Sequence, residues 1–97
     1  MRIISKRPGN AKMNLTLDRL LPEHSAAISS VHATGMAGER MAALGLTPGR
    51  QVTLLRRAPF GGPLHLRIGP TELMIRRIDA RAIVLDRVHR WKPQHKS

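Results

Sequence analysis

Short stretches in which apolar and polar residues alternate run along most of the chain and predict β-strands. The clearest stretch places Leu64, Leu66 and Ile68 on one side of a strand, with His65 and Arg67 on the other. Similar alternation predicts strands over residues 25–32, 52–57, 71–76 and 82–85. Because each stretch is short and ends in turn-forming residues, the pattern is typical of an antiparallel fold.

Glycine and proline separate the first of these strands from the second. A short helix is expected over residues 38–44, and Gly45 follows it as a residue that can take positive φ. We expect residues 47–50 to reverse the chain in a type II turn, with Pro48 at its second position and Gly49 at its third. Gly45, Pro48 and Gly49 are therefore assigned to turn structure.

A leucine-rich segment precedes the first strand and contains too few apolar residues for a stable helix. Pro22 ends whatever turn this segment forms, so we expect it to pack beneath the domain. Its leucines are Leu15, Leu17, Leu20 and Leu21. The whole pattern predicts a mainly β fold, a small SH3-like barrel of about five antiparallel strands with one or two short helices.

Composition and charge limit the classes of protein to consider. Ninety-seven residues make a single domain, and the absence of cysteine excludes disulfides and thiolate metal sites. Most of the net charge of +11 lies at the two ends. We expect residues 1–12 to be a flexible basic extension, residues 13–88 the barrel, and residues 89–97 a basic tail. No apolar run approaches the ~18 residues of a membrane-spanning helix, so a cytoplasmic protein without membrane insertion is expected.

The sequence favours a protein without enzymatic activity. A phosphate-binding loop would need a lysine after its second glycine, and the segment from Gly35 to Gly38 lacks one. None of the serines lies on a sharp strand-to-helix turn of the kind that exposes a catalytic nucleophile. We therefore assign no catalytic residues.

The candidate metal ligands are His24, His32 and His65. No two histidines have the spacing of a shared metal site, and His24 and His32 should lie about 25 Å apart at opposite ends of one strand. Exposed, solvated histidines are therefore the first interpretation. If iron(II) or zinc binds, we expect weak binding between two copies of the chain, which would form a homodimer.

The connection over residues 58–63 carries an apolar residue at a loop tip. Phe60, between Pro59 and Gly61, has little core to enter, and exposed apolar loop tips often mark contact surfaces. We therefore expect Pro59, Phe60 and Gly61 to bind a partner. Arg76 and Arg77 are either the solvated end of a strand or part of the same binding surface.

Three segments in register resemble the FeoA family of bacterial ferrous iron uptake. They are the helix and Pro-Gly turn of residues 40–49, the hairpin of residues 58–63, and the closing strands that begin at residues 73–80. The resemblance covers roughly residues 13–88. Two positions depart from the family pattern, since Glu23 follows Pro22 where glycine is usual and Met41 stands where leucine is common.

The resemblance implies an SH3-like barrel that regulates the membrane transporter FeoB without catalytic residues of its own. The expected partner surface is the cytoplasmic G domain of the transporter, contacted by residues 59–61 and by the arginine pair. The alternative is a basic SH3-like barrel that binds nucleic acid, a function suggested by the net charge. With one aromatic residue beside basic ones in the tail, nucleic acid is the less favoured partner.

Overall fold

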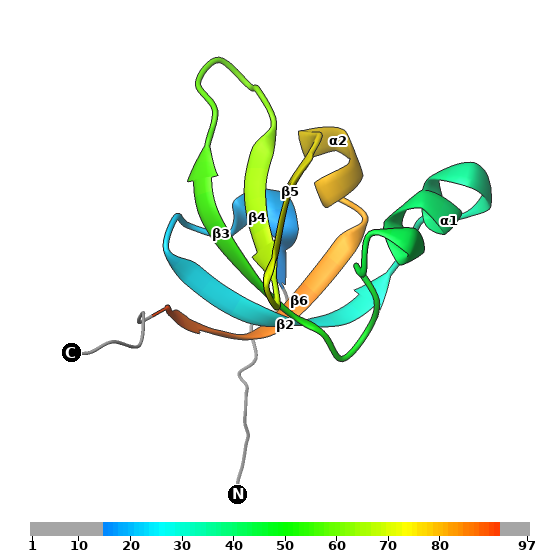
Figure 1. Ribbon diagram of the computed structural model, residues 1–97, viewed down its shortest axis with the longest axis horizontal. Helices are drawn as coiled ribbons and strands as arrows, with labels where there is room; N and C mark the ends of the chain where they lie inside the picture. The colour runs from blue at the N-terminus through cyan, green and yellow to red at the C-terminus, as the bar shows by residue number, and fades with distance from the viewer. Residues whose placement is uncertain (1–14, 92–97) are drawn as a thin grey trace, which may run out of the picture.

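The structure, a computed structural model, describes residues 15–91 as one antiparallel sheet with three short helical segments (Figure 1). The strands are β1 (Leu15–Thr16), β2 (His24–Val31), β3 (Gln51–Arg57), β4 (Leu64–Ile68), β5 (Thr71–Ile75) and β6 (Ile83–Arg90). The helical segments are the 3-10 helix η2 (Leu17–Arg19), α1 (Gly35–Ala43) and α2 (Arg77–Ala80). The strand order β1-β6-β2-β3-β4-β5 confirms a mainly β fold. Six strands form rather than five, because Leu15 and Thr16 pair with β6.

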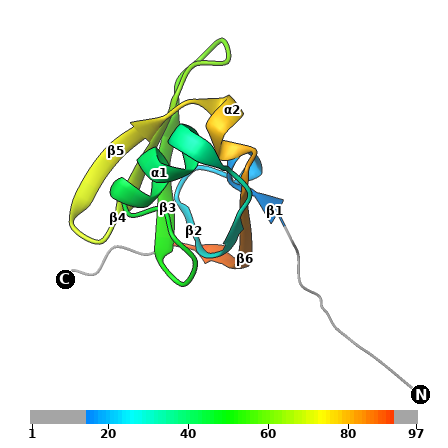
Figure 2. The ribbon, with the colours of Figure 1, turned by 90° about the vertical axis from the view of Figure 1, so that its right-hand side faces the viewer.

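Strand β2 lies at the centre of the sheet and bends twice. It pairs with β3 on one side and with β6 on the other. Its pairing with β6 shifts register between Ser25 and Ala27, and again between Ile28 and Ser30. Such irregularities increase the bend and twist of a strand. Figure 2 shows the result, a strongly curved sheet that wraps around a single interior.

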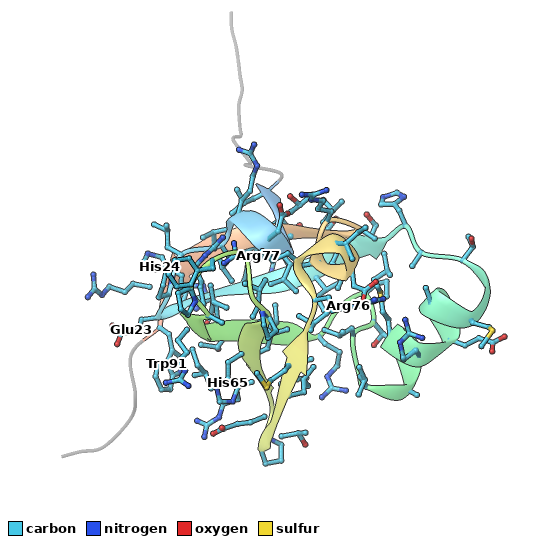
Figure 3. All side chains as sticks on the ribbon, turned by 90° about the horizontal axis from the view of Figure 1, so that it is seen from above. Glu23, His24, His65, Arg76, Arg77 and Trp91 are labelled. Atoms are coloured by element: carbon cyan, nitrogen blue, oxygen red, sulfur yellow. The ribbon has the colours of Figure 1, made fainter. Side chains whose placement is uncertain are left out.

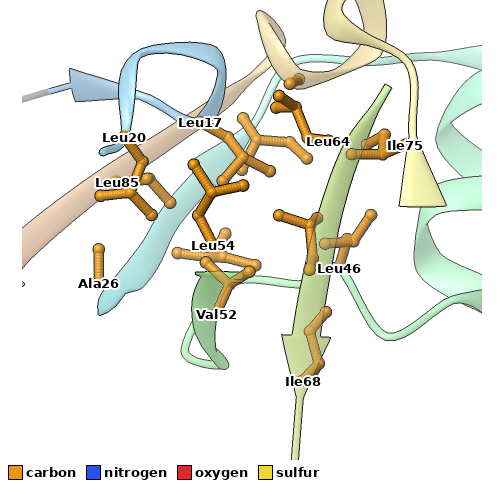
Figure 4. Packing of buried hydrophobic residues seen from close by; sticks show 14 of the residues in the cluster. Leu17, Leu20, Ala26, Leu46, Val52, Leu54, Leu64, Ile68, Ile75 and Leu85 are labelled. Atoms are coloured by element: carbon orange, nitrogen blue, oxygen red, sulfur yellow. The ribbon is translucent and has the colours of Figure 1, made fainter. Parts of the chain in front are cut away.

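The interior is filled by aliphatic side chains from the strands and helices (Figure 4). Among the described residues, the buried apolar set contains no aromatic side chain; it consists of Leu17, Leu20, Ala26, Ile28, Met41, Leu46, Val52, Leu54, Leu64, Leu66, Ile68, Ile75, Ala80, Ile83 and Leu85. The leucine-rich lead-in packs into the core through Leu17 and Leu20, whereas Leu21 is mostly exposed. The predicted alternation of β4 is confirmed, because its three apolar residues are all buried.

Helix α1 begins earlier than predicted, at Gly35 instead of Gly38. Gly38, the predicted first residue, lies inside the helix, where a Cβ atom would lie 2.7 Å from the Ala33 carbonyl oxygen. The glycine therefore permits a close approach between the helix and the preceding segment.

The predicted turn over residues 47–50 is confirmed: Gly49 has a φ of 91°, and the Arg50 N–H donates to the Thr47 carbonyl over 3.2 Å. Gly45 also has positive φ, at 92°.

Strand β6 continues to Arg90, well past the predicted end at residue 85 and beyond residue 88, where the barrel was expected to end. It pairs with β2 as far as His24 and Arg90, with Arg87 at a φ of 55° near the register shift. The predicted extension over residues 1–12 lies outside the described residues, as does the tail from residue 92. Within residues 15–91, none of the helices is long and apolar enough to span a membrane.

The turn at Gly49 provides a test of backbone strain without crowding, because a Cβ atom there would meet no atom within 4 Å. We expect Gly49→Val to lower the free energy of unfolding by roughly 1–3 kcal/mol. Gly49→Asn should cost less, because asparagine tolerates left-handed conformations. Gly45→Val should resemble Gly49→Val. Urea denaturation followed by circular dichroism measures each change, and equal midpoints for wild type and both valine variants would contradict the assignment.

Candidate functional site

The connection between β3 and β4 forms a projecting hairpin tip, which stands at the top of the molecule in Figure 1. Two backbone hydrogen bonds close it, from the Ala58 N–H to the Pro63 carbonyl over 3.0 Å and from the Gly62 N–H to the Pro59 carbonyl over 3.1 Å. Phe60 occupies the tip and is fully exposed. The hairpin therefore presents an apolar ring to the solvent, away from the core.

The backbone of Phe60 adopts a conformation that disfavours its own side chain. Its φ is 60°, in the left-handed region, which costs a residue with a Cβ atom roughly 1–2 kcal/mol relative to ordinary backbone. Burial of the ring does not offset this cost, because the side chain is fully exposed. Strain without a gain in packing is typical of positions maintained for binding.

Arg77, at the start of α2, holds the hairpin from the side. Its guanidinium donates from Nε to the Gly62 carbonyl over 2.9 Å and from Nη2 to the Ala58 carbonyl over 3.0 Å. These two carbonyls lie on either side of Phe60 in the loop. The partly buried arginine therefore joins α2 to both arms of the hairpin.

Arg76 bonds within its own segment, and Figure 3 shows it set apart from Arg77. Its Nε donates to Asp79 Oδ2 over 3.1 Å, and its Nη2 lies 3.5 Å from Asp79 Oδ1. The two arginines of the pair thus have different surroundings. The structure brings both of them beside the hairpin, a proximity that the sequence did not establish.

A groove of about 500 Å³ lies between the hairpin and α2, and we call it the hairpin–α2 groove. Its lining comprises Gly61, Gly62, Pro63, Arg76, Arg77, Ile78 and Arg81. The sequence pattern did not indicate Ile78 and Arg81, because both lie in the interval between the strands predicted over residues 71–76 and 82–85. Ile78 is 63% exposed, and the Arg81 side chain is 69% exposed with its Nε 4.0 Å from Asp18 Oδ2. The groove therefore combines apolar surface with three guanidinium groups.

The candidate metal ligands do not converge. His32 Nε2 lies 2.9 Å from Ser30 Oγ, and His24 Nδ1 lies 3.1 Å from the Pro22 carbonyl oxygen. His65 Nε2 lies 3.2 Å from Glu72 Oε1 on the neighbouring strand. No group of three or more potential ligands occurs among residues 15–91. Figure 3 places His24 and His65 at the end of the barrel away from Arg76.

Residues 15–87 match the FeoA domain family, which spans most of the chain. The chain belongs to the FeoA family. Two solved relatives are each 30% identical to it. FeoA from Stenotrophomonas maltophilia, described as an SH3 domain protein and solved complexed with zinc, is matched over 78% of this chain and 96% of its own, with a TM-score of 0.69. FeoA protein from Chlorobium tepidum is matched over 84% of this chain and 74% of its own, with a TM-score of 0.67.

A third solved structure, the iron uptake regulatory protein FeoA, is 22% identical and supports the fold alone. It covers 76% of this chain and 97% of its own, with a TM-score of 0.71. None of the curated proteins matches the chain. Family and fold confirm the predicted SH3-like barrel and place the chain among the small proteins associated with ferrous iron transport.

The strain at Phe60 predicts an unusual response to substitution. Phe60→Gly relieves the left-handed strain, whereas Phe60→Ala removes the same ring but keeps a Cβ atom. We expect the glycine variant to exceed the alanine variant in free energy of unfolding by about 1 kcal/mol. Chemical denaturation of both variants measures the difference. A glycine variant less stable than the alanine variant would show that the backbone conformation carries no strain.

Proposed function

We propose that this FeoA-family chain is a cytoplasmic, non-enzymatic accessory protein that regulates ferrous iron uptake by binding the G domain of a FeoB-type transporter. The observation that carries this proposal is Phe60, an exposed aromatic residue in a strained conformation at the tip of a fixed hairpin. A protein gains no folding stability from such a residue. Its presence is explained by a contact made outside the chain.

The surroundings of Phe60 support docking on a protein. Ile78 adds exposed apolar surface within the hairpin–α2 groove, which is also lined by arginines. Aromatic residues and arginine are enriched where protein interfaces carry most of their binding energy. The two prolines at residues 59 and 63 limit the conformational entropy that the loop loses on binding. The positive charge of the groove favours a partner with an acidic surface.

The chemistry of the groove favours binding over catalysis. The charged side chains that line it are guanidinium groups, which donate hydrogen bonds and do not act as bases at neutral pH. Their arrangement suits the recognition of anionic groups. This supports an accessory role in which the transporter performs the chemistry.

Phe60→Ala is the direct test of docking. We expect it to weaken binding to the isolated cytoplasmic G domain of the FeoB from the same genome by roughly 1–2 kcal/mol, the usual effect of removing an interface anchor. Met36→Ala is the matched control, because Met36 is also an exposed apolar residue but lies on α1. Binding isotherms measure the affinities, and thermal melts check folding. Equal affinity of wild type and Phe60→Ala would rule out this face.

The salt dependence of binding separates the transporter from nucleic acid as a partner. Binding through six phosphate contacts should weaken by ~10³-fold or more between 50 and 200 mM salt. Docking through Phe60 and neighbouring apolar groups should change far less. Tight, steeply salt-dependent binding to single-stranded RNA that is unaffected by Phe60→Ala would favour the nucleic-acid function.

We also propose that iron(II) or zinc binds weakly between two copies of the chain. The observation in support is that residues 15–91 hold no group of three potential ligands, and pairs such as His65 and Glu72 supply only two. The solved Stenotrophomonas maltophilia relative was complexed with zinc. A second copy would complete a tetrahedral site from two such pairs.

Calorimetry with zinc, alongside sedimentation, tests the metal proposal. We expect low affinity, one metal per two chains, and dimer formation only when metal is present. His65→Ala should abolish the dimer, while His32→Ala should leave it unchanged. Tight binding of one zinc by a strict monomer would contradict the bridging geometry.

A further inference from the structure

We propose that the hairpin–α2 groove receives an acidic side chain of the partner, with Arg81 binding the carboxylate and Arg77 acting as a positioning residue that holds Phe60 in place. The inference rests on the proposed function, since it specifies what the docking face recognises. It also gives different roles to two arginines that line the same groove, since Arg81 contacts the partner and Arg77 contacts the hairpin.

Arg77 is committed to the hairpin. Two of its donors, on Nε and Nη2, are used by the Gly62 and Ala58 carbonyls at 2.9 and 3.0 Å. Because the guanidinium is rigid and planar, these two hydrogen bonds fix both the distance and the angle between the two arms of the hairpin. Lysine at this position would supply a flexible point charge without that fork. Arg77 therefore acts on a partner through the loop that carries Phe60.

Of the three arginines that line the groove, Arg81 has parallel N–H donors available to bind a partner. Its Nε forms only a long ion pair with Asp18 Oδ2, at 4.0 Å and beyond hydrogen-bond distance, and Arg81 makes no side-chain hydrogen bond within residues 15–91. Arg76, by contrast, bonds to both oxygens of Asp79. A guanidinium with free parallel donors binds a carboxylate in bidentate fashion. Arg81 is therefore the natural receptor for an anion entering the groove.

The neighbouring apolar residues favour a protein segment as the source of that anion. Ile78 lies in the groove lining with 63% of its surface exposed, and Phe60 stands at the hairpin tip above. An aliphatic side chain beside a guanidinium matches an acidic residue that has an apolar neighbour. A nucleic acid would instead bind the arginines through its backbone phosphates, and Ile78 would be left without a suitable contact. The occupant is thus an acidic and apolar segment on the G domain.

Titration of the full chain against the isolated G domain tests the role of Arg81. We expect Arg81→Gln to weaken binding about tenfold, and Arg81→Lys to retain part of the affinity because the charge remains without the fork. Arg40→Gln, the same change on the exposed face of α1, should bind as wild type does. Wild-type affinity in Arg81→Gln, together with weaker binding of Phe60→Ala, would overturn the inference and leave the proposed function standing. Absence of binding by the wild type would overturn both.

A double-mutant cycle tests the positioning role of Arg77. If Arg77 acts only through Phe60, Arg77→Gln should weaken binding about tenfold in the wild type and have no further effect in Phe60→Ala. Arg81→Gln should weaken binding in both backgrounds. An equal loss from Arg77→Gln in the two backgrounds would show that Arg77 contacts the partner directly.

A measurement on the free chain gives a second readout that does not depend on any partner. Phe60 is the only phenylalanine in the sequence, so fluorophenylalanine labelling gives a single ¹⁹F signal from the hairpin tip. We expect Arg77→Gln and Arg77→Lys to shift and narrow this signal as the loop becomes more mobile, and Arg76→Gln to leave it unchanged. Thermal melts confirm that the variants are folded. An unchanged ¹⁹F signal in both Arg77 variants would overturn the positioning role.

Discussion

The double bend of β2 is the constraint on which the rest of the structure depends. A chain this short encloses a core only if its sheet curves back on itself, and β2 pairs on both sides while changing register twice. At the first bend, Ser25 is buried with its hydroxyl 2.6 Å from that of Thr53 on β3. One of the two hydroxyls donates to the other, so both buried oxygens at the bend have a hydrogen-bond partner. The curvature then brings β6, the lead-in and α2 around one interior.

Among residues 15–91, three residues other than glycine have positive φ, and they differ in what stabilises them. Glu23 precedes β2 at the position where the family usually has glycine; its N–H donates to the Leu54 carbonyl over 2.7 Å, and its carbonyl accepts from the Trp91 N–H over 2.8 Å. Arg87 lies beside a register shift, where an extra residue needs unusual backbone. The conformations of Glu23 and Arg87 therefore serve the sheet. Phe60 has the same backbone at a central position of the turn from Pro59 to Gly62, but glycine or asparagine would adopt that conformation at lower cost. The exposed phenyl ring, which the turn does not need, is therefore what points to a role outside folding.

Local chemistry explains which features were predictable from the sequence. The Pro-Gly turn at residues 47–50 and the alternation of β4 depend on the conformational preferences of a few neighbouring residues. The exposure of Phe60 followed from the turn residues on either side of it. Each of these predictions is confirmed because no distant contact is needed to produce it.

Features set by distant partners were not predictable. The length of β6 depends on its pairing with β2. The bonds from Arg77 to the hairpin join residues 15 and 19 positions apart. Sequence pattern alone could not distinguish Arg77 from Arg76, or give Arg81 a place in the groove. The candidate site is thus a product of tertiary packing.

The pairing of β2 with β6 also sets the order in which the chain can fold. It joins residues near the start of the barrel to the last strand made, so the closed sheet cannot form until β6 is available. The meander of β3, β4 and β5 has only short connections, and such local pairing forms early at low cost in loop entropy. The hairpin that carries Phe60 belongs to this early unit. The hairpin tip can therefore form before the barrel closes. The hydrogen bonds that Arg77 donates to it form only once α2 has folded.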